Sequence, residues 1–336
     1  MKFRFLAALS IATMLAVIPV EAQTAARAPG TAAKAKGSPV SRTPDGRPDL
    51  SGVWSFANLT PLERPAEFAG KATLTPQEAA DYAKRFNERR NADRRDGGAQ
   101  ADVSRAYNDA WYDYGSNVSL QTSLIINPPD GKLPPLTPEA EKRAGARAQM
   151  LQRLPNGPED RPLWERCILG FNSGPPMMPS GYNNNVQIFQ TKDYVALLNE
   201  MVHSSRIIPL DGRPHGATRL WLGDSRGRWE GDTLVVDTIN FTNNGTGTIG
   251  LRIGTDENFH LTERFTPRDA NTMTYEFTVN DPTVWTKPWT ASVPMAKSNQ
   301  PVYEYACHEG NYGMQGILAG ARADEKAAAE AAKRAN

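Results

Sequence analysis

The 336-residue sequence has only two cysteines and four histidines, and this scarcity limits the chemistry that it can perform. No two histidines have the spacing of a metal-ligand motif such as H-x-H or H-E-x-x-H, so nothing indicates a zinc site. Glycine-rich dinucleotide fingerprints, P-loops, G-x-S-x-G elbows and C-x-x-C-H haem attachment motifs are also missing. We therefore expect no bound metal and no organic cofactor.

Neither an excess of one charge nor a long internal apolar run is present. The formal net charge is +1, with 38 basic and 37 acidic side chains interspersed, so nucleic acid is not an expected partner. The one apolar run, 5–20, follows Lys2 and Arg4 and precedes small residues, which is typical of a signal peptide, here 1–22. We expect a periplasmic or secreted protein without membrane insertion, whose partner is a small-molecule ligand or substrate.

The composition after residue 22 predicts a flexible linker, 23–48, followed by a single domain over 49–320. The linker is rich in Ala, Gly, Pro and Lys and has no periodicity. Two Leu-Thr-Pro sequences predict helices over about 76–94 and 138–154, because Thr75 and Thr137 are N-caps followed by proline. They belong to a helical insertion at about 75–155, and the Ala-rich segment 321–336 predicts a C-terminal helical tail.

From about Asn185 onward, short segments with alternating apolar residues predict β-strands. They include a hairpin about 267–271 and a final strand over 301–308. Because no helical crossovers separate the strands, we expect an antiparallel meander that closes as a barrel or a sandwich, with an up-and-down barrel favoured. Gly52-Val53-Trp54 resembles the first strand of lipocalin-type barrels. The predicted fold class is mainly β, a lipocalin-like barrel with an N-terminal helical segment.

Cys167 and Cys307 form an even pair in a chain that we expect to be exported, which predicts a disulfide. Such a bridge, closing a loop of about 140 residues, would stabilise the fold by roughly 5 kcal/mol on the chain-entropy model. Two separate buried thiols are the alternative.

Five segments of the chain resemble a widespread family of uncharacterised exported bacterial proteins. They are RTPDGRPDLSGVW, TSLIINPPDGKLPPLTPEA, RIIPLDGRPH, DSRGRWEGDTLVVDTINF and YEYACHEGNY. The resemblance covers most of the chain after the signal peptide and implies export. It implies no reaction and no catalytic residues, so function has to be inferred from the residues themselves.

All four histidines lie in the predicted β region, and two or three of them in one cavity could divide acid and base roles. The candidate catalytic residues are His203, His215, His308, Asp237 and Glu309. His203 and Glu200 point to opposite faces of a regular strand, so an acidic partner for His203 has to come from elsewhere. The alternative for each histidine is a hydrogen-bonded core or rim residue, and for each carboxylate a solvated surface position.

Polar residues beside predicted strands could contact a polyol or a polar aromatic ligand. The candidate substrate-binding residues are Tyr182, Asn183, Asn184, Arg206 and Asn240. Turn chemistry alone also explains asparagines at such positions, including the Asn243-Asn244-Gly245 sequence.

The function that these residues favour is a cofactor-independent lyase, isomerase or hydrolase that uses histidine and an acid in a barrel pocket. A lipocalin-like binding protein without catalysis and an envelope structural protein are the alternatives. Convergence of at least one histidine and a carboxylate on an accessible point distinguishes the enzyme from both.

Overall fold

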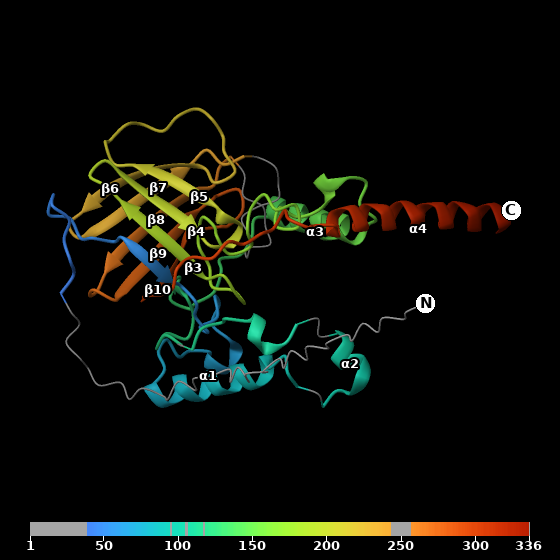
Figure 1. The fold of residues 1–336 in the computed structure, drawn as a ribbon, viewed down its shortest axis with the longest axis horizontal. Helices are drawn as coiled ribbons and strands as arrows, with labels where there is room; N and C mark the ends of the chain where they lie inside the picture. Colours follow the sequence, from blue (N-terminus) through green and yellow to red (C-terminus); the bar gives the residue numbers. More distant parts are fainter. Residues whose placement is uncertain (1–38, 95, 105–106, 117, 243–256, 336) are drawn as a thin grey trace, which may run out of the picture. The chain divides into compact units, whose positions relative to one another are not determined.

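An antiparallel sheet of ten strands dominates the structure, a computed structural model that describes residues 39–94, 96–104, 107–116, 118–242 and 257–335. Nine strands follow the order β5-β4-β3-β1-β10-β9-β8-β7-β6, and β2 pairs with β10. The strands are β1 (Gly52–Ser55), β2 (Ile125–Asn127), β3 (Asn185–Gln190), β4 (Tyr194–Asn199), β5 (Ser205–Pro209), β6 (Asp224–Glu230), β7 (Thr233–Ile239), β8 (His260–Pro267), β9 (Thr272–Asn280) and β10 (Trp289–Ser298). They curl into a nearly closed barrel (Figure 1), which confirms the predicted fold class.

The barrel closes where its edge strands β5 and β6 meet. Gly227 of β6 has no side chain, and a Cβ there would lie 2.5 Å from Cδ2 of Leu210 and 2.9 Å from Cγ2 of Ile208. Side chains from β5 and the residue that follows it therefore pack directly onto the backbone of β6. Across the interior, Arg206 of β5 pairs with Glu263 of β8, with N–O distances of 2.6 and 2.8 Å. Side-chain contacts of this kind hold the edge strands together.

Large apolar side chains occupy the interior of the barrel. Trp54, Tyr275 and Trp289 are each at most 2% exposed, and Met177 and Met178, from the buried segment 172–178, belong to the same core. The backbone N–H of Met177 donates to the Tyr275 hydroxyl at 3.1 Å. Burial of a large apolar side chain contributes on the order of 1.5–3 kcal/mol, so this interior is the main source of stability.

Helix α1 (Pro76–Arg90) begins as its sequence predicts. Oγ1 of Thr75 accepts from the backbone N–H of Glu78, and the Glu78 carboxylate accepts from the N–H of Thr75 at 2.8 Å. The helix ends at Arg90, earlier than the predicted residue 94, and Asn91 has non-helical dihedral angles. The capping box therefore fixes the start, whereas no comparable signal marked the end.

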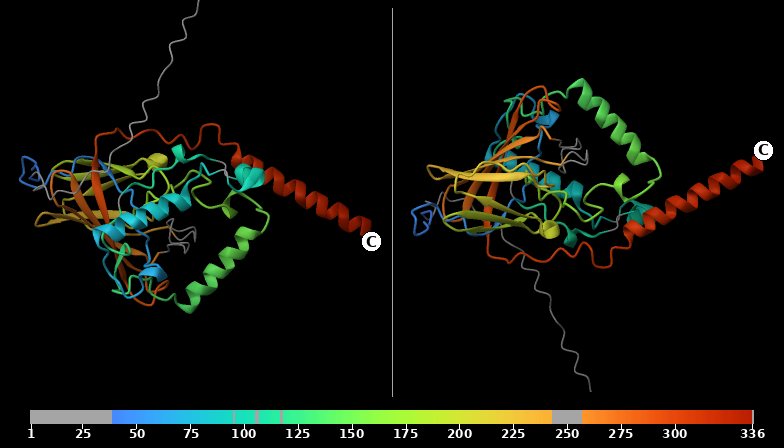
Figure 2. Two further views of the ribbon diagram at one scale, coloured as in Figure 1. Left: turned by 90° about the horizontal axis from the view of Figure 1, so that it is seen from below. Right: turned by 90° about the horizontal axis from the view of Figure 1, so that it is seen from above.

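Helix α3 (Pro138–Gln152) also starts at the predicted N-cap, Thr137. Oγ1 of Thr137 accepts from the N–H of Ala140 at 3.1 Å, and the backbone N–H of Thr137 donates to the carbonyl of Val284 at 2.9 Å. This bond ties α3 to the β9–β10 connection (Figure 2). The other helices are α2 (Gly98–Ser104), α4 (Gly313–Ala335) and the 3₁₀ turns η1 (Ala66–Phe68), η2 (Asp109–Trp111), η3 (Pro158–Asp160) and η4 (Met201–His203).

The predicted final strand over 301–308 is wrong, because the last strand is β10 and no strand follows it in the described chain. The sequence of β10 contains Pro294, and a proline within a sequence argues against its being a central strand. The N–H of Ser292 donates toward β2, to the Leu124 carbonyl at 2.8 Å. The nitrogen of Pro294 faces the same side, in the gap between the pairings with β2 and β1. The proline therefore removes no ladder bond.

The ends of the described chain also differ from the sequence prediction. Helix α4 begins at Gly313 rather than at residue 321. Within the predicted linker, Arg42 forms an ion pair with Asp232 at 2.8 Å, and Pro48 is buried. Residues of the predicted linker thus make specific contacts with the barrel domain.

The predicted disulfide is confirmed. Cys167 and Cys307 are bonded, with their Cα atoms 5.7 Å apart. The bridge joins the segment before β3 to the chain that follows β10. Among the described residues, no helix has the length and apolar character needed to cross a membrane.

Candidate functional site

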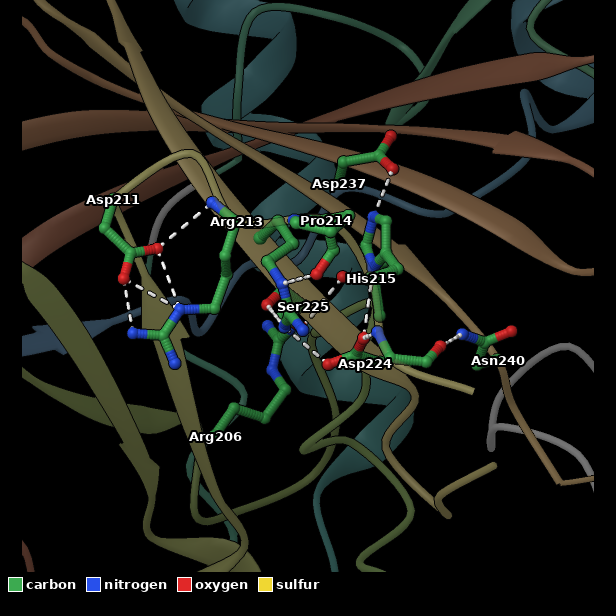
Figure 3. Close-up of polar contacts among 12 residues, drawn as sticks. Arg206, Asp211, Arg213, Pro214, His215, Asp224, Ser225, Asp237 and Asn240 are labelled. Carbon is green, nitrogen blue, oxygen red and sulfur yellow. Dashed lines mark hydrogen bonds and ion pairs between the residues drawn. The ribbon is translucent and has the colours of Figure 1, made fainter. Parts of the chain in front are cut away.

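Two histidines and two aspartates meet where β6 and β8 begin and β7 ends. Nε2 of His215 lies 3.0 Å from Oδ2 of Asp237, and Nε2 of His260 lies 2.6 Å from Oδ1 of the same carboxylate. Nδ1 of His215 is 3.3 Å from Oδ2 of Asp224 (Figure 3). We refer to His215, Asp224, Asp237 and His260 as the His–Asp cluster. One carboxylate, Asp237, thus contacts both imidazoles.

The strand register explains why three of these residues are neighbours. Asp237 of β7 pairs with Thr262 of β8, so His260 is its diagonal neighbour. In the same way Asp224 of β6 pairs with Ile239 and is the diagonal neighbour of Asp237. Diagonal neighbours share one face of a sheet and long side chains can reach across. The register alone therefore brings the three side chains together.

The His–Asp cluster lies on the outer face of the barrel. Asp237 and His260 alternate along their strands with the core residues Val236 and Leu261, which are 0% exposed. Because successive side chains of a strand point to opposite faces, the cluster faces away from the core. The sequence had favoured a histidine–acid site in a barrel pocket, and the structure places these groups on the outside, near the strand ends.

His215 comes from the β5–β6 connection, whose backbone is fastened to the same strands. The N–H of Gly216 donates to Oδ2 of Asp224 at 2.7 Å, and the amide of Asn240 donates to the carbonyl of Gly216 at 2.6 Å. Arg226 donates through Nε to the carbonyl of Pro214 at 3.0 Å. These bonds hold the residues on both sides of His215, so the ring is fixed against Asp237.

Electrostatics within the cluster favour an ionised aspartate beside an imidazolium. The hydrogen bond from His260 lowers the pKa of Asp237, and the same bond raises the pKa of His260. An ionised carboxylate only accepts hydrogen bonds, so Nε2 of each imidazole donates to Asp237. In neutral His260 the lone pair is then on Nδ1, the nitrogen that faces away from the carboxylate.

The two histidines differ in accessibility. The side chain of His260 is 42% exposed and that of His215 is 21% exposed. Oδ2 of Asp224 lies 3.3 Å from Nδ1 of His215, without hydrogen-bond geometry. The other oxygen of this carboxylate, Oδ1, accepts from NH1 of Arg226 at 2.5 Å. His260 is therefore the ring that a solute can reach, and His215 is the ring that the protein encloses.

Three predicted catalytic residues lie outside the cluster. His203 is exposed in η4 and has a φ of 40°. His308 and Glu309 are exposed beside the disulfide. Of the catalytic candidates, the structure unites only His215 and Asp237. His260 was considered only as one of the four histidines of the β region and is not among the catalytic candidates, and neither is Asp224. The signal that identifies both is the hairpin register, because the correct pairing of β6, β7 and β8 makes them neighbours of Asp237.

The predicted substrate-binding residues are divided among different roles. Asn184 is buried, and its amide donates to the carbonyls of Asp113 and Ser180 at 2.9 and 3.0 Å. Asn183 and Asn240 have positive φ values, 53° and 60°, which fits the turn chemistry named as the alternative. Tyr182 lines a cavity. The Asn243-Asn244-Gly245 sequence lies outside the described residues.

Arg206, also expected near a ligand, lies inside the barrel. Its side chain is 4% exposed and that of Glu263 is 0% exposed. The Tyr275 hydroxyl donates to Oε1 of Glu263 at 2.8 Å. Burial alone lowers the pKa of Arg206, but the attraction of Glu263 outweighs it and raises the pKa above its ordinary value. The guanidinium is thus committed to an internal ion pair.

Within the described chain, no group of three or more His, Cys, Asp and Glu side chains is arranged to hold a metal ion. Comparison of the sequence with models of known families, with curated proteins and with solved structures found no match. The functional argument therefore rests on the geometry of the chain itself.

Proposed function

We propose that this protein is an exported enzyme that transfers a proton to or from a small molecule at the His–Asp cluster. The observation that supports the proposal is one partly buried carboxylate, Asp237, that binds Nε2 of two histidines and leaves one of those rings accessible. A histidine oriented by a carboxylate, with its other nitrogen free, is the arrangement that general acid–base catalysis requires.

His260 is the group that exchanges the proton. The Asp237 carboxylate raises the pKa of His260, which extends the pH range in which the ring holds a proton to donate. After donation, Nδ1 carries the lone pair that takes up the next proton. Asp237 is a positioning residue, because it fixes the tautomer and orientation of the ring, and His215 holds Asp237 in place from its other oxygen.

Eliminations, isomerisations and hydrolyses can proceed by proton transfer to and from the substrate. The protein is therefore a lyase, an isomerase or a hydrolase. Export is supported by the apolar N-terminal run and by the disulfide, which is typical of oxidising compartments. Membership of the family of exported bacterial proteins that the sequence resembles stays a prediction.

The test is a screen of the protein against chromogenic esters, lactones and glycosides, followed by variants assayed on any substrate that is turned over. Replacing His260 by alanine is expected to lower kcat/KM by about 10²–10⁴-fold, the usual contribution of a general acid or base. His203→Ala is the matched control, because His203 is an exposed histidine outside the cluster. Equal losses in the two variants, or none in His260→Ala, would refute the proposal.

A pH profile separates a proton-transfer role from a structural one. In Asp237→Asn the charge that raises the pKa of His260 is lost, so the limb of kcat/KM that His260 controls should move to lower pH. A variant that merely disturbs the fold lowers the rate at every pH and leaves the limb in place.

A further inference from the structure

A cavity of about 500 Å³ lies among tyrosine side chains that do not belong to the His–Asp cluster. We call it the tyrosine cavity. Its principal lining residues are Asn58, Tyr82, Phe86, Tyr112, Tyr114 and Tyr182, with Arg90 also among the residues that line it. Ligand sites in proteins commonly measure about 300–1,000 Å³ and combine aromatic walls with a few polar groups.

One wall of the tyrosine cavity comes from helix α1. Tyr82, Phe86 and Arg90 are spaced four residues apart, so their side chains lie along one face of the helix. The guanidinium carbon of Arg90 lies 5.6 Å from the ring centroid of Phe86 and 5.5 Å from that of Tyr114. A cation thus stands over two of the aromatic rings.

A second part of the lining, formed by Tyr112, Tyr114 and Gly181, is fixed by backbone pairing and contacts the first, because the ring centroids of Phe86 and Tyr114 are 5.5 Å apart. The rings of Tyr112 and Tyr114 stack with their centroids 5.4 Å apart and their planes at 9°. Between them, the N–H of Asp113 donates to the carbonyl of Gly181 at 2.7 Å. A Cβ on Gly181 would lie 3.3 Å from both tyrosine rings, closer than most contacts allow. The rings therefore rest against a glycine backbone in a preformed position.

Two polar groups of the cavity, Asn58 and Arg90, have hydrogen-bond donors that are available to a ligand. Asn58 is only 7% exposed, and although its Oδ1 accepts from the N–H of Thr60 at 2.7 Å, its Nδ2 has no hydrogen-bond partner in the described structure. Arg90 is exposed and forms no ion pair with a carboxylate of the described residues. Burial raises the pKa of Tyr182 to about 12, so its hydroxyl keeps its proton at neutral pH.

We propose that the tyrosine cavity binds a small planar aromatic carboxylate, with its ring against the tyrosine rings and its carboxylate paired with Arg90. Stacked and edge-on aromatic walls suit a flat ring better than an aliphatic one. The unpaired guanidinium and the unsatisfied amide of Asn58 supply donors for an anion. This binding does not depend on the proposed acid–base function, because no residue of the His–Asp cluster lines the cavity.

The first experiment titrates the protein with 4-hydroxybenzoate and follows binding by ligand-detected NMR. Phenol keeps the ring but lacks the carboxylate, and cyclohexanecarboxylate keeps the charge but lacks the aromatic ring. We expect saturable binding of 4-hydroxybenzoate and affinities about tenfold weaker for each comparison compound. No saturation below about 10 mM, or equal affinity for all three compounds, overturns the proposal.

Variants then assign the binding to the tyrosine cavity. Arg90→Gln is expected to weaken 4-hydroxybenzoate about tenfold and to leave phenol unchanged, whereas Tyr114→Leu weakens both. Arg85→Gln is the matched control, since Arg85 lies on the same helix, 5.9 Å from the ring of Tyr82, but does not line the cavity. An equal loss in Arg85→Gln overturns the assignment. Arg90 is exposed, so its variant is expected to fold even where Tyr114→Leu does not.

Discussion

Removal of the guanidinium from the barrel interior should destabilise the protein strongly. In Arg206→Met the buried Glu263 carboxylate keeps the Tyr275 hydroxyl at 2.8 Å but loses both bonds from the guanidinium. Breaking a buried ion pair by removing one partner costs about 3–5 kcal/mol, because a charge stays desolvated without compensation. Since domains are typically stable by about 5–15 kcal/mol, the variant should retain only a fraction of its stability.

The assay is urea unfolding under non-reducing conditions, followed by tryptophan fluorescence, because Trp54 and Trp289 are buried in the same core. Arg264→Met is the matched control. Arg264 lies next to Glu263 on the outer face, and its ion pair with Glu230 at 2.9 Å joins side chains that are each 40% exposed. Exposed pairs contribute about 0–1 kcal/mol, so this variant should unfold close to the wild type.

The double variant Arg206→Met/Glu263→Leu provides the decisive comparison. Replacing both partners of a buried pair by apolar groups is often neutral, so most of the lost stability should return. A single variant Arg206→Met that unfolds within about 0.5 kcal/mol of the wild type would show that water or another group compensates Glu263, and the reasoning would fail.

Three further perturbations test other parts of the structure. Reduction of the Cys167–Cys307 disulfide should lower the free energy of unfolding by up to about 5 kcal/mol, measured by guanidinium unfolding with and without reductant. Because the pKa of His260 is raised from 6.5, its stabilising contribution is complete below pH 6.5 and is lost as the pH rises. Because the pKa of Asp237 is lowered from 3.8, its contribution is complete above pH 3.8 and is lost as the pH falls. The stability deficit of Asp237→Asn should therefore be greatest between these values, and a pH-independent deficit contradicts the assignment. Gly227→Val should cost about 1–3 kcal/mol by overpacking the β5–β6 contact, and an unchanged melting temperature would mean that the barrel closes differently.

Local signals in the sequence predicted local structure well. The capping box of Thr75 and Glu78 marked the start of α1, and the turn at 267–271 marked the β8–β9 hairpin. The cysteine pair predicted the disulfide because a chain with two cysteines has one possible intramolecular pairing. Each of these features depends on residues that are close in sequence or on a pairing with no alternatives.

The candidate site depended on information that a single strand does not contain. Asp237 is a candidate because of its place near a predicted strand end, yet its partner His260 is 23 residues away. Their contact follows from the register of β7 against β8, which the strand sequences specify only in combination. The same limit explains Arg206, whose polar character suggested a ligand contact although Glu263, distant in sequence, pairs with it inside the barrel.

The internal ion pair and the external cluster are linked by the two-residue period of a strand. Glu263 and His260 are three positions apart in β8, so a register that directs Glu263 to the interior necessarily directs His260 outward. A slip of one residue would expose Glu263 and bury His260, and the Arg206 guanidinium would then be buried without a partner. That penalty, on the order of several kcal/mol, disfavours the slipped register. The buried pair therefore acts together with the buried Leu261 and Phe265 to specify which face of β8 meets the solvent, and so helps to keep His260 beside Asp237 where a solute can reach it.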